Sequence, residues 1–359
     1  MTAAMTTIRE LIDKLYDTGN LSPAELKKIL TDDDPENAAY LERKARKTAD
    51  TVYGKKIFVR GLIEFTNHCR NNCLYCGIRA RNSGIRRYRL SDAEIISCCE
   101  NGYRLGYRTF VLQGGEDVFY TDDKITAIIS AIKKRFPDCA VTLSIGEKSK
   151  ESYERFRAAG ADRYLLRHET ADGGHYGKLH EKCQSFANRM RCLNDLKAVG
   201  FQTGCGFMVG SPYQTVDHLV KDLCFIKKFN PEMVGIGPFI PHSGTPFAAF
   251  NAGSAAMTVK LLAIIRLLLP YVLLPATTAL ATVTKDGRKL GIMAGANVIM
   301  PNLSPADKRE LYSLYDRKAC TGNEAAEMIA AIEREIKSLG YEIACSRGDC
   351  KKPDTEGKR

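Results

Sequence analysis

The stretch Ile57-Phe-Val-Arg-Gly-Leu-Ile-Glu-Phe-Thr-Asn-His-Cys69-Arg-Asn-Asn-Cys73-Leu-Tyr-Cys76 joins an apolar run to a loop that carries three cysteines. The apolar run predicts a buried strand, and the cysteines follow it with the spacing C-x3-C-x2-C. Three thiolates this close together can hold one iron–sulfur cluster. A cubane cluster has four irons, so three protein ligands leave one iron open to bind a small molecule and pass it an electron. We therefore expect a [4Fe–4S] cluster on Cys69, Cys73 and Cys76, and an enzyme with redox chemistry.

A zinc site and a disulfide are the alternative uses of these cysteines. A structural zinc ion normally takes four protein ligands, and the fourth would have to be His68 or a distant residue. The close pair-of-pairs spacing of zinc ribbons is missing. A disulfide requires an oxidising compartment. The open-site cluster is therefore the favoured interpretation.

The composition is that of an ordinary soluble globular protein. The chain has 359 residues, of which 44% are hydrophobic and 26% are charged. Its first residues lack the apolar run of a signal peptide, and the most apolar stretch, 261–274, is interrupted by Arg266 and Pro270, so no membrane span is expected. Thirteen cysteines in such a chain indicate a reducing compartment. We expect a cytoplasmic protein.

The net charge of +11 raises the question of an acidic partner. The basic residues are dispersed, without a long Lys/Arg block or a basic stretch interleaved with aromatics, so nucleic acid binding is disfavoured. Local basic clusters at 79–81 and 86–87 flank the cysteine loop. They favour a basic face for an acidic protein partner, or a solvated surface.

From Lys56 onward, short apolar runs alternate with amphipathic segments of helical length. The apolar runs are 57–65, 109–112, 141–145, 164–166, 203–209, 233–240, 272–274 and 298–300. The helical patterns lie near 91–104, 122–135, 149–159, 184–199, 214–229, 255–269, 285–294 and 305–316. Eight such units predict an α/β fold with a (β/α)8 barrel of the TIM type. An open doubly wound sheet is the alternative, but it would want Gly-x-Gly-x-x-Gly after its first strand.

The predicted organisation has three parts. Residues 1–55 form an N-terminal helical extension, in which Ser22-Pro-Ala-Glu25 is a capping box. Residues 56–320 form the barrel. Residues 321–359 hold a last helix, a short strand and a polar tail that we expect to be disordered over 351–359.

Polar residues and glycines follow every predicted strand, and in such barrels the active site lies at the C-terminal ends of the strands. These segments are Gln113-Gly-Gly-Glu116, Ser144-Ile-Gly-Glu147, Arg167-His-Glu-Thr170, Gly206-Phe-Met-Val-Gly210, Gly235-Ile-Gly-Pro-Phe-Ile-Pro-His242, Thr277-Thr278 and 297–302. Arg167 and Glu169 alternate along the chain, so we expect them on the same side of one strand. They would act on a substrate or, alternatively, form an internal ion pair.

The spacing of Cys69, Cys73 and Cys76, with Tyr75 just before the last cysteine, resembles the signature of radical S-adenosylmethionine (SAM) enzymes, and Gly114-Gly115-Glu116 resembles a second motif of that superfamily. The segments 167–172, 206–210, 235–242, 276–280 and 295–302 resemble the HydE-type maturases of [FeFe]-hydrogenase, which are related to biotin synthase and methylornithine synthase. The resemblance runs from about Lys56 to Cys320. It implies that the open iron binds SAM and that one electron cleaves SAM to methionine and a 5′-deoxyadenosyl radical.

The resemblance also implies roles for individual residues. Tyr75 would lie beside the adenine, Glu116 would accept hydrogen bonds from the cofactor ammonium, and Arg189 would pair with the cofactor carboxylate, with Arg191 as its rival. The implied cofactor site consists of Tyr75, Gln113, Gly114, Gly115, Glu116, Ser144, Glu169, Arg189 and Met233. The implied substrate pocket consists of Arg167, Thr277, Thr278, Met300, Tyr312 and Tyr315, with Arg167 and Glu169 as the catalytic residues.

The function implied is assembly of the hydrogenase active site. The substrate would be a small cysteine-bound iron carbonyl cyanide complex from a partner maturase, whose sulfur the radical attacks, and an electron donor would be needed. The alternatives are a lysine mutase of the methylornithine type and a non-catalytic iron–sulfur scaffold. A second cluster near Cys320 is disfavoured, because the next cysteines are Cys345 and Cys350. We expect free thiols there.

Overall fold

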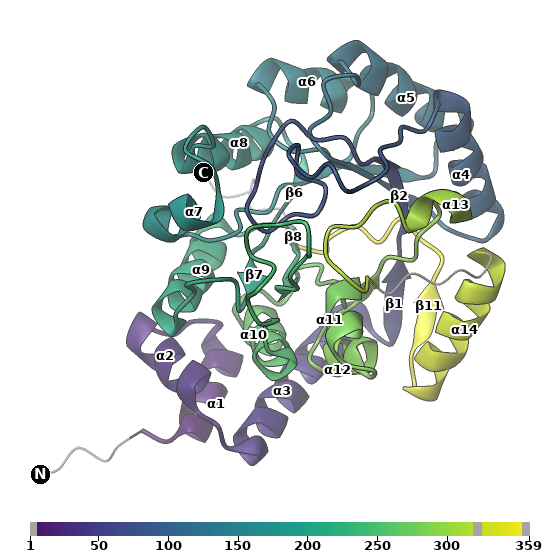
Figure 1. The fold of residues 1–359 in the computed structure, drawn as a ribbon. Helices are drawn as coiled ribbons and strands as arrows, with labels where there is room; N and C mark the ends of the chain where they lie inside the picture. Colours follow the sequence, from purple (N-terminus) through teal and green to yellow (C-terminus); the bar gives the residue numbers. More distant parts are fainter. Residues whose placement is uncertain (1–5, 319–324, 354–359) are drawn as a thin grey trace, which may run out of the picture.

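Six parallel strands form the main sheet of the computed structural model, which describes residues 6–318 and 325–353 (Figure 1). Each strand pairs with the strands of the neighbouring units, in the order in which the units follow along the chain. The order is β2 (Gly61–Thr66), β3 (Thr109–Gly114), β4 (Ala140–Ser144), β5 (Arg163–Leu165), β6 (Gln202–Cys205) and β8 (Met233–Val234). This parallel order brings the C-terminal ends of all six strands to one rim.

Short bridges carry the sheet around to its own beginning. Met233 in β8 bridges to Leu273, and Pro275 bridges to Val298 in β10 (Val298–Ile299). β10 pairs with β1 (Lys56–Val59). The backbone N–H of Leu62 then donates to the carbonyl of Pro301 at 2.9 Å. The predicted α/β barrel is confirmed, although the seventh segment is an irregular bridge and not a regular strand.

Three predicted strands are each divided in two. The run 57–65 breaks at Arg60, so β1 pairs with β10 and β11 (Glu342–Ala344) while β2 pairs with β3. The run 203–209 breaks at Gly206, where a Cβ atom would meet the carbonyl oxygen of Gly235 at 2.0 Å. The residues beyond the break form β7 (Met208–Val209), which pairs with β9 (Gly237–Pro238), the second half of the run 233–240.

Helices cover the outside of the sheet (Figure 1). Those that match predicted patterns are α4 (Asp92–Arg104), α5 (Asp122–Arg135), α6 (Lys150–Ala158), α8 (Phe186–Ala198), α9 (Val216–Phe229), α10 (Ala255–Leu268) and α12 (Gly287–Met293). Two further helices, α7 (Gly173–Leu179) and α11 (Thr278–Val283), were not predicted. The pattern at 305–316 yields only α13 (Ala306–Arg309). Its remainder folds over the barrel rim as a loop, where Tyr312 lines a cavity.

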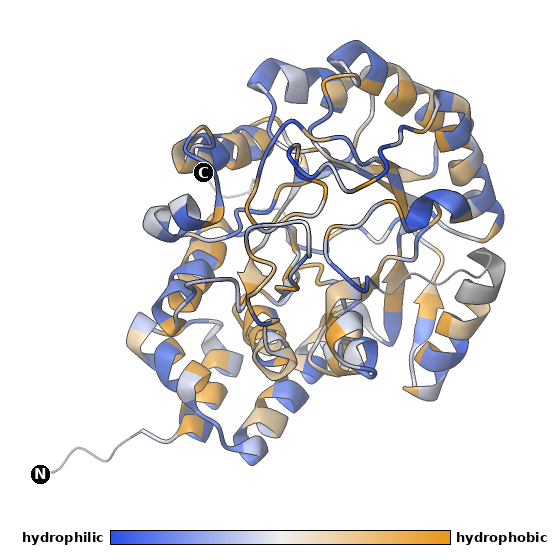
Figure 2. Cartoon of the chain, in the orientation of Figure 1, coloured by the Kyte–Doolittle hydropathy of each residue, from blue (hydrophilic) through white to orange (hydrophobic). Residues whose placement is uncertain are grey.

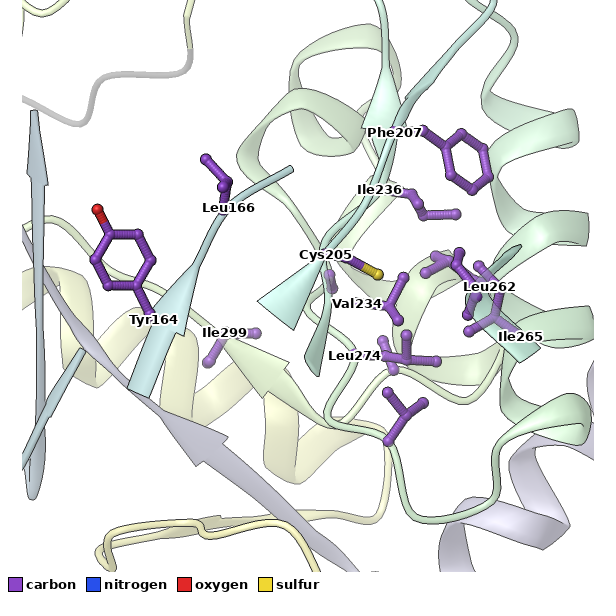
Figure 3. Close-up of a cluster of buried hydrophobic side chains, with 14 of the residues drawn as sticks. Tyr164, Leu166, Cys205, Phe207, Val234, Ile236, Leu262, Ile265, Leu274 and Ile299 are labelled. Atoms are coloured by element: carbon purple, nitrogen blue, oxygen red, sulfur yellow. The ribbon is translucent and has the colours of Figure 1, made fainter. Parts of the chain in front are cut away.

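The main core lies between the sheet and this helical layer. Figure 2 shows apolar residues on inward helix faces and polar residues outside. In Figure 3, Leu262 and Ile265 of α10 lie against Val234, Ile236 and Leu274. Burial of each such side chain contributes about 1.5–3 kcal/mol. The apolar character of α10 thus reflects a buried position, and no helix in the described residues is long and apolar enough to cross a membrane.

Three N-terminal helices pack against one side of the barrel. They are α1 (Ile8–Thr18), α2 (Pro23–Thr31) and α3 (Pro35–Tyr53), of which α3 packs on α10 and α2 on α9. The predicted capping box at Ser22 is present, with the Ser22 hydroxyl accepting from the backbone N–H of Glu25. Such a cap stabilises a helix start by about 1 kcal/mol.

The C-terminal segment closes the N-terminal end of the barrel. After α14 (Ala325–Ser338), β11 adds to β1, as the predicted last helix and short strand require. Asp349 then lies 2.6 Å from the fully buried guanidinium of Arg163. The expectation of a disordered tail from Lys351 was wrong for its first residues, because Lys352 Nζ contacts Glu232 at 3.1 Å and the Asn230 carbonyl. Residues 354–359 lie outside the described part.

Candidate active site

A cavity of about 310 Å³ opens where the strands of the main sheet end. That volume is within the range of small-molecule sites. Its lining includes most of the residues singled out from the sequence: Cys69, Cys73, Tyr75, Cys76, Gln113, Gly114, Gly115, Glu116, Ser144, Arg167, Glu169, Arg189, Thr277, Tyr312 and Tyr315. The fold therefore brings the cysteine loop to one space with residues at or after the ends of β3, β4, β5, β6 and β8 and with Thr277.

Arg87 stabilises the conformation of the cysteine loop through hydrogen bonds to backbone carbonyls. Its Nη1 donates to the carbonyls of Asn67 and Ile78 at 2.5 and 2.8 Å, and its Nη2 donates to that of Arg79 at 2.6 Å. One guanidinium thus ties the start of the loop to its far side, so the cysteines have fixed positions. His68 lines a separate groove on the outer side, away from the cavity with the three thiols.

The three cysteine thiols are largely buried. Burial raises the pKa of Cys69 and Cys76 above the usual thiol value, and raises the pKa of Cys73 to about 11. Thiols in such surroundings ionise only with a strong positive partner, which bound metal supplies. The donor set therefore suits iron ligation better than free thiolate chemistry.

Gly115 allows the second motif to pack against the cysteine loop. A Cβ atom at this position would meet the carbonyl oxygen of His68 at 2.2 Å and Cys69 Cβ at 2.6 Å. The next residue, Glu116, donates its backbone N–H to Cys69 Sγ at 3.4 Å. Its carboxylate lines the cavity and accepts from Arg70 and from the backbone N–H of Glu147 at 3.0 Å. The motif thus places one carboxylate beside the first cysteine.

Arg167 and Glu169 meet in the cavity wall. β5 ends at Leu165, so both residues lie beyond the strand and not on it, and Glu169 has a left-handed φ of 65°. Arg167 Nη2 lies 2.9 Å from Glu169 Oε2. Neither atom has hydrogen-bond geometry to a partner among the described residues, and neither has Arg167 Nε. Buried polar atoms of this kind normally bind something, and a strained backbone is common at functional sites.

Arg189 reaches the cavity, whereas Arg191 does not. Arg189 is buried, donates to Glu147 Oε1 at 2.5 Å and to the carbonyl of Arg167 at 2.6 Å, and lines the cavity. Arg191 is exposed on α8 and pairs with Asp195 in the next turn. Of the two arginines, only Arg189 lies where it can contact the carboxylate of a ligand in the cavity.

Two tyrosines, half-buried Tyr75 and buried Tyr312, complete the wall. Tyr75 Oη lies 3.2 Å from Nε2 of His180, whose Nδ1 lies 3.0 Å from the carbonyl of Tyr176. Since a carbonyl only accepts, Nδ1 carries the proton and Tyr75 donates to Nε2. Burial lowers the pKa of His180 to about 3, so the ring is neutral. Tyr312 accepts from Gln113 Nε2 at 3.4 Å.

Three residues of the implied site lie elsewhere. Thr278 and Met300 line a neighbouring cavity of about 110 Å³, which shares Thr277 with the main one. Met233 lines neither of these two cavities and packs at the closed end of the barrel, where its sulfur lies 3.0 Å from Arg60 Nη1. Nothing in this placement brings Met233 to the cysteine loop.

The late cysteines are also away from the cavity. Cys345 is exposed, and Cys350 is half-buried with its thiol 3.0 Å from the carbonyl of Tyr271. Neither cysteine forms a disulfide with another described residue. Cys320 lies outside the described residues.

Sequence inspection missed several groups that support the site. Gln184 Nε2 lies 3.2 Å from Cys73 Sγ. Arg70 forms an ion pair with Glu116, and Glu147 forms an ion pair with Arg189. His180 accepts a hydrogen bond from the hydroxyl of Tyr75. Glu147 stands in a segment that the sequence did single out, but Gln184 stands where the sequence predicts only the start of a helix, and it lies in the loop before α8.

The geometry fits a [4Fe–4S] cluster with SAM on its open iron. Three largely buried thiols line a space that is also lined by the Arg167–Glu169 ion pair and by buried Arg189. Cys69, Cys73 and Cys76 would hold the cluster. Glu116 and Arg189 offer a carboxylate and a guanidinium, which are complementary to the amine and the carboxylate of an amino acid.

Removing the amide of Gln184 should lower the reduction potential of the cluster. A hydrogen bond to a ligand sulfur stabilises the added negative charge of the reduced state. A bond of about 0.5–1.5 kcal/mol corresponds to roughly 20–60 mV in a one-electron couple. We expect Gln184→Leu to shift the midpoint in an EPR redox titration by about this amount, with Cys183→Ala next to it as an unshifted control.

Other residues of the segment 167–172 support the backbone. His168 is fully buried, accepts from the N–H of Gly206 and donates to Asp222 at 3.2 Å. Asp172 caps α7 by accepting from the N–H of His175, and Lys221 lies against it. This part of the motif therefore orients the chain around Arg167 and Glu169.

Asp172→Asn isolates the charge of that cap, because Asn caps a helix about as well as Asp. Lys221 and the cap bond lower the pKa of Asp172 to about 2 from 3.8. Such a carboxylate stabilises the fold above pH 3.8 and loses that contribution as the pH falls toward 2. Because Lys221 is half exposed, we expect a loss of at most about 1 kcal/mol at pH 7. Urea unfolding should show the two proteins converging near pH 2.

The comparisons with known proteins agree with this geometry. Residues 63–226 match the Radical SAM superfamily. The chain is 44% identical over 93% of its length to the "[FeFe] hydrogenase maturase subunit HydE" of Thermotoga maritima, of which it covers 95%. It is 29% identical over 92% of its length to the 3-methylornithine synthase of Methanosarcina acetivorans, of which it covers 93%. The crystal structure of methylornithine synthase (PylB) superimposes with a TM-score of 0.83 at 28% identity, over 93% of this chain and 97% of that one.

Proposed function

Because the chain belongs to the radical SAM superfamily and, within it, to the HydE-type maturases, we propose that it works in assembling the active site of [FeFe]-hydrogenase. As a radical SAM enzyme it uses a [4Fe–4S] cluster and SAM. The proposal goes beyond family membership in naming the reaction and its substrate. It rests above all on one observation, that the cysteine loop and the Arg167–Glu169 ion pair, whose hydrogen-bonding capacity is not filled within the described residues, line one cavity.

The bound cluster and SAM supply a 5′-deoxyadenosyl radical, and the protein's own residues position the reactants. Arg189, held by Glu147, binds the carboxylate of the cofactor, and Glu116, held by Arg70, receives its ammonium. Tyr75 has a fixed ring because His180 accepts from its hydroxyl. Fixed donors and acceptors of this kind lower the barrier by orienting the reacting groups before the reaction.

The substrate is a cysteine-bound iron carbonyl cyanide complex, and its sulfur is the atom attacked. The amino-acid part of such a complex has a carboxylate and an amine, which are complementary to Arg167 and Glu169. The backbone that carries these two side chains is held near the C-terminal ends of the strands, because the N–H of Glu169 donates to the Gly206 carbonyl at 3.0 Å. Other hydrogenase maturases would supply the complex and take the product.

An in vitro maturation assay tests the proposal. Hydrogenase lacking its active-site two-iron unit is incubated with the partner maturases, SAM and reductant, with or without this chain. We expect hydrogen evolution only when the chain is present. Equal activation without it would overturn the proposed role.

A lysine mutase is the second candidate, and the 29% identity to 3-methylornithine synthase favours its inclusion. The two functions share the cluster and the cofactor but differ in substrate. Turnover of lysine by the loaded protein, together with inactivity toward the iron complex, would decide for the mutase. A non-catalytic scaffold would instead transfer its cluster equally well after Glu116→Gln.

A further inference from the structure

The segment 67–90, called here the arginine loop, is strongly basic. It holds six arginines and no aspartate or glutamate. Arg70, Arg81, Arg86 and Arg89 are exposed. Arg70, Arg81 and Arg89 pair with Glu116, Glu181 and Asp117, but the six arginines outnumber these three acids, so the surface stays positive. Arg87, the clamp described above, fixes the backbone that presents them, so their positions are set before any partner arrives. An exposed cationic surface of this kind attracts acidic partners over long distances.

A groove of about 200 Å³ runs along this loop on the outer face of the molecule. Its lining is His68, Cys69, Arg70, Ala80, Arg87, Arg89, Glu116, Asp117 and Val118. Cys69 and Glu116 line both this outer groove and the active-site cavity. A single layer of side chains therefore separates the surface from the place of the cluster. Electron tunnelling falls steeply with distance, so this is a short path to the cluster.

An apolar patch adjoins the outer groove. Val118 is 72% exposed and Phe119 is 46% exposed. Lys124 Nζ lies 3.3 Å and the Arg89 guanidinium carbon 4.8 Å from the centre of the Phe119 ring. Arginines around exposed aromatic and aliphatic side chains are typical of protein interfaces. Small interfaces are also typical of transient electron-transfer pairs.

We propose that the outer groove and the arginine loop form the docking face of an acidic one-electron carrier protein, and that electrons reach the cluster on the Cys69 side. The inference rests on the proposed radical function, because it supplies the electron which that function needs. The reduced carrier loses one electron and the cluster gains it, passing from the 2+ to the 1+ state, without transfer of a proton. A docked protein suits this face better than nucleic acid because a cluster ligand and an apolar patch lie within it.

Reversing the charge of two arginines in the arginine loop tests this proposal. Arg81→Glu/Arg86→Glu changes two exposed residues that do not line the active-site cavity. Lys28→Glu/Lys47→Glu makes the same change in net charge on α2 and α3. Each reconstituted protein is mixed anaerobically with an acidic flavodoxin in its hydroquinone form, and stopped-flow absorbance follows electron transfer. Photoreduced 5-deazariboflavin serves as the small reductant.

For the wild type we expect fast reduction by flavodoxin that slows as salt is added. The Arg81→Glu/Arg86→Glu variant, called here the rim variant, should be reduced by flavodoxin about tenfold more slowly than the wild type at low salt. The Lys28→Glu/Lys47→Glu control should be reduced at the same rate as the wild type. All three proteins should accept electrons equally from the small reductant. Equal rates for the rim variant and the wild type with flavodoxin would overturn the proposal, as would an equal loss in the control.

Two further measurements exclude other occupants of the face. Self-association of the wild type that disappears in the rim variant would assign the face to a second copy and overturn the proposal. Binding of an RNA oligonucleotide more tightly than flavodoxin would do the same. Failure of the radical function itself is separable, since it would appear as absent SAM cleavage in wild-type protein already reduced by the small reductant.

Discussion

A Cys76→Ala variant is expected to lose the [4Fe–4S] cluster and, with it, all SAM cleavage. Cys76 lines the cavity between Tyr75 and the turn at Gly77. That turn leaves no room for a shifted ligand, because a Cβ atom at Gly77 would meet His242 and the Ser313 carbonyl at 2.2 Å. With two thiols left, the cluster has too few ligands to persist. Iron analysis, EPR of the reduced protein and deoxyadenosine by mass spectrometry measure the loss.

Cys183→Ala is the matched control for this effect. Cys183 is an exposed free thiol on the loop that carries Gln184. The control should keep its cluster and its activity. A full cluster in Cys76→Ala, or a lost cluster in Cys183→Ala, would show that the three-cysteine assignment is mistaken.

Glu169→Gln is expected to keep the cluster and to lose about 10²-fold or more in kcat/KM. The substitution preserves shape but removes the charge that faces Arg167 at 2.9 Å. Loss of one preorganised electrostatic contact in an enclosed site costs roughly 3 kcal/mol of transition-state stabilisation. Glu169 also holds a left-handed φ of 65°, which Gln tolerates as poorly as Glu, so backbone strain is unchanged.

The kinetic pattern separates the two roles of Glu169. If it meets the cofactor, the apparent SAM affinity falls; if it meets the substrate, SAM binding persists and coupled turnover is lost. Glu181→Gln removes an acid that pairs with Arg79 and Arg81 outside the cavity, and should leave turnover intact. Wild-type kinetics in Glu169→Gln would contradict a catalytic or binding role.

The barrel was predictable because its periodicity is strong, whereas its irregular parts depend on tertiary contacts. α7 has three glycines in seven residues, which lowers its helix propensity, and α11 has only six residues, too few to show a helical period. Both form where a side-chain cap, Asp172 or Thr277, starts the turn. The Arg60-Gly61 pair is a local sign that the strand breaks there. The local sequence does not indicate, however, that β1 pairs with β10 and β11 while β2 pairs with β3.

The site was predictable as far as motifs reach. The cysteines and Gly114–Glu116, which the motifs singled out, line one cavity. The supporting contacts join residues far apart in the chain, such as Gln184 and Cys73, which are 111 positions apart. The local sequence pattern does not indicate which residues will contact each other over such separations. Met233 shows the opposite error, since it is the first residue of β8 and its side chain does not line the cavity.

The radical function is tested best by measuring SAM cleavage with and without the substrate. Anaerobically reconstituted protein is given SAM, a one-electron reductant and the cysteine-bound iron carbonyl cyanide complex, and deoxyadenosine and methionine are quantified over time. We expect both products to form together, much faster with the complex than with lysine or with no addition. A fully loaded protein that cleaves no SAM, with or without the complex, would contradict the radical function at its centre.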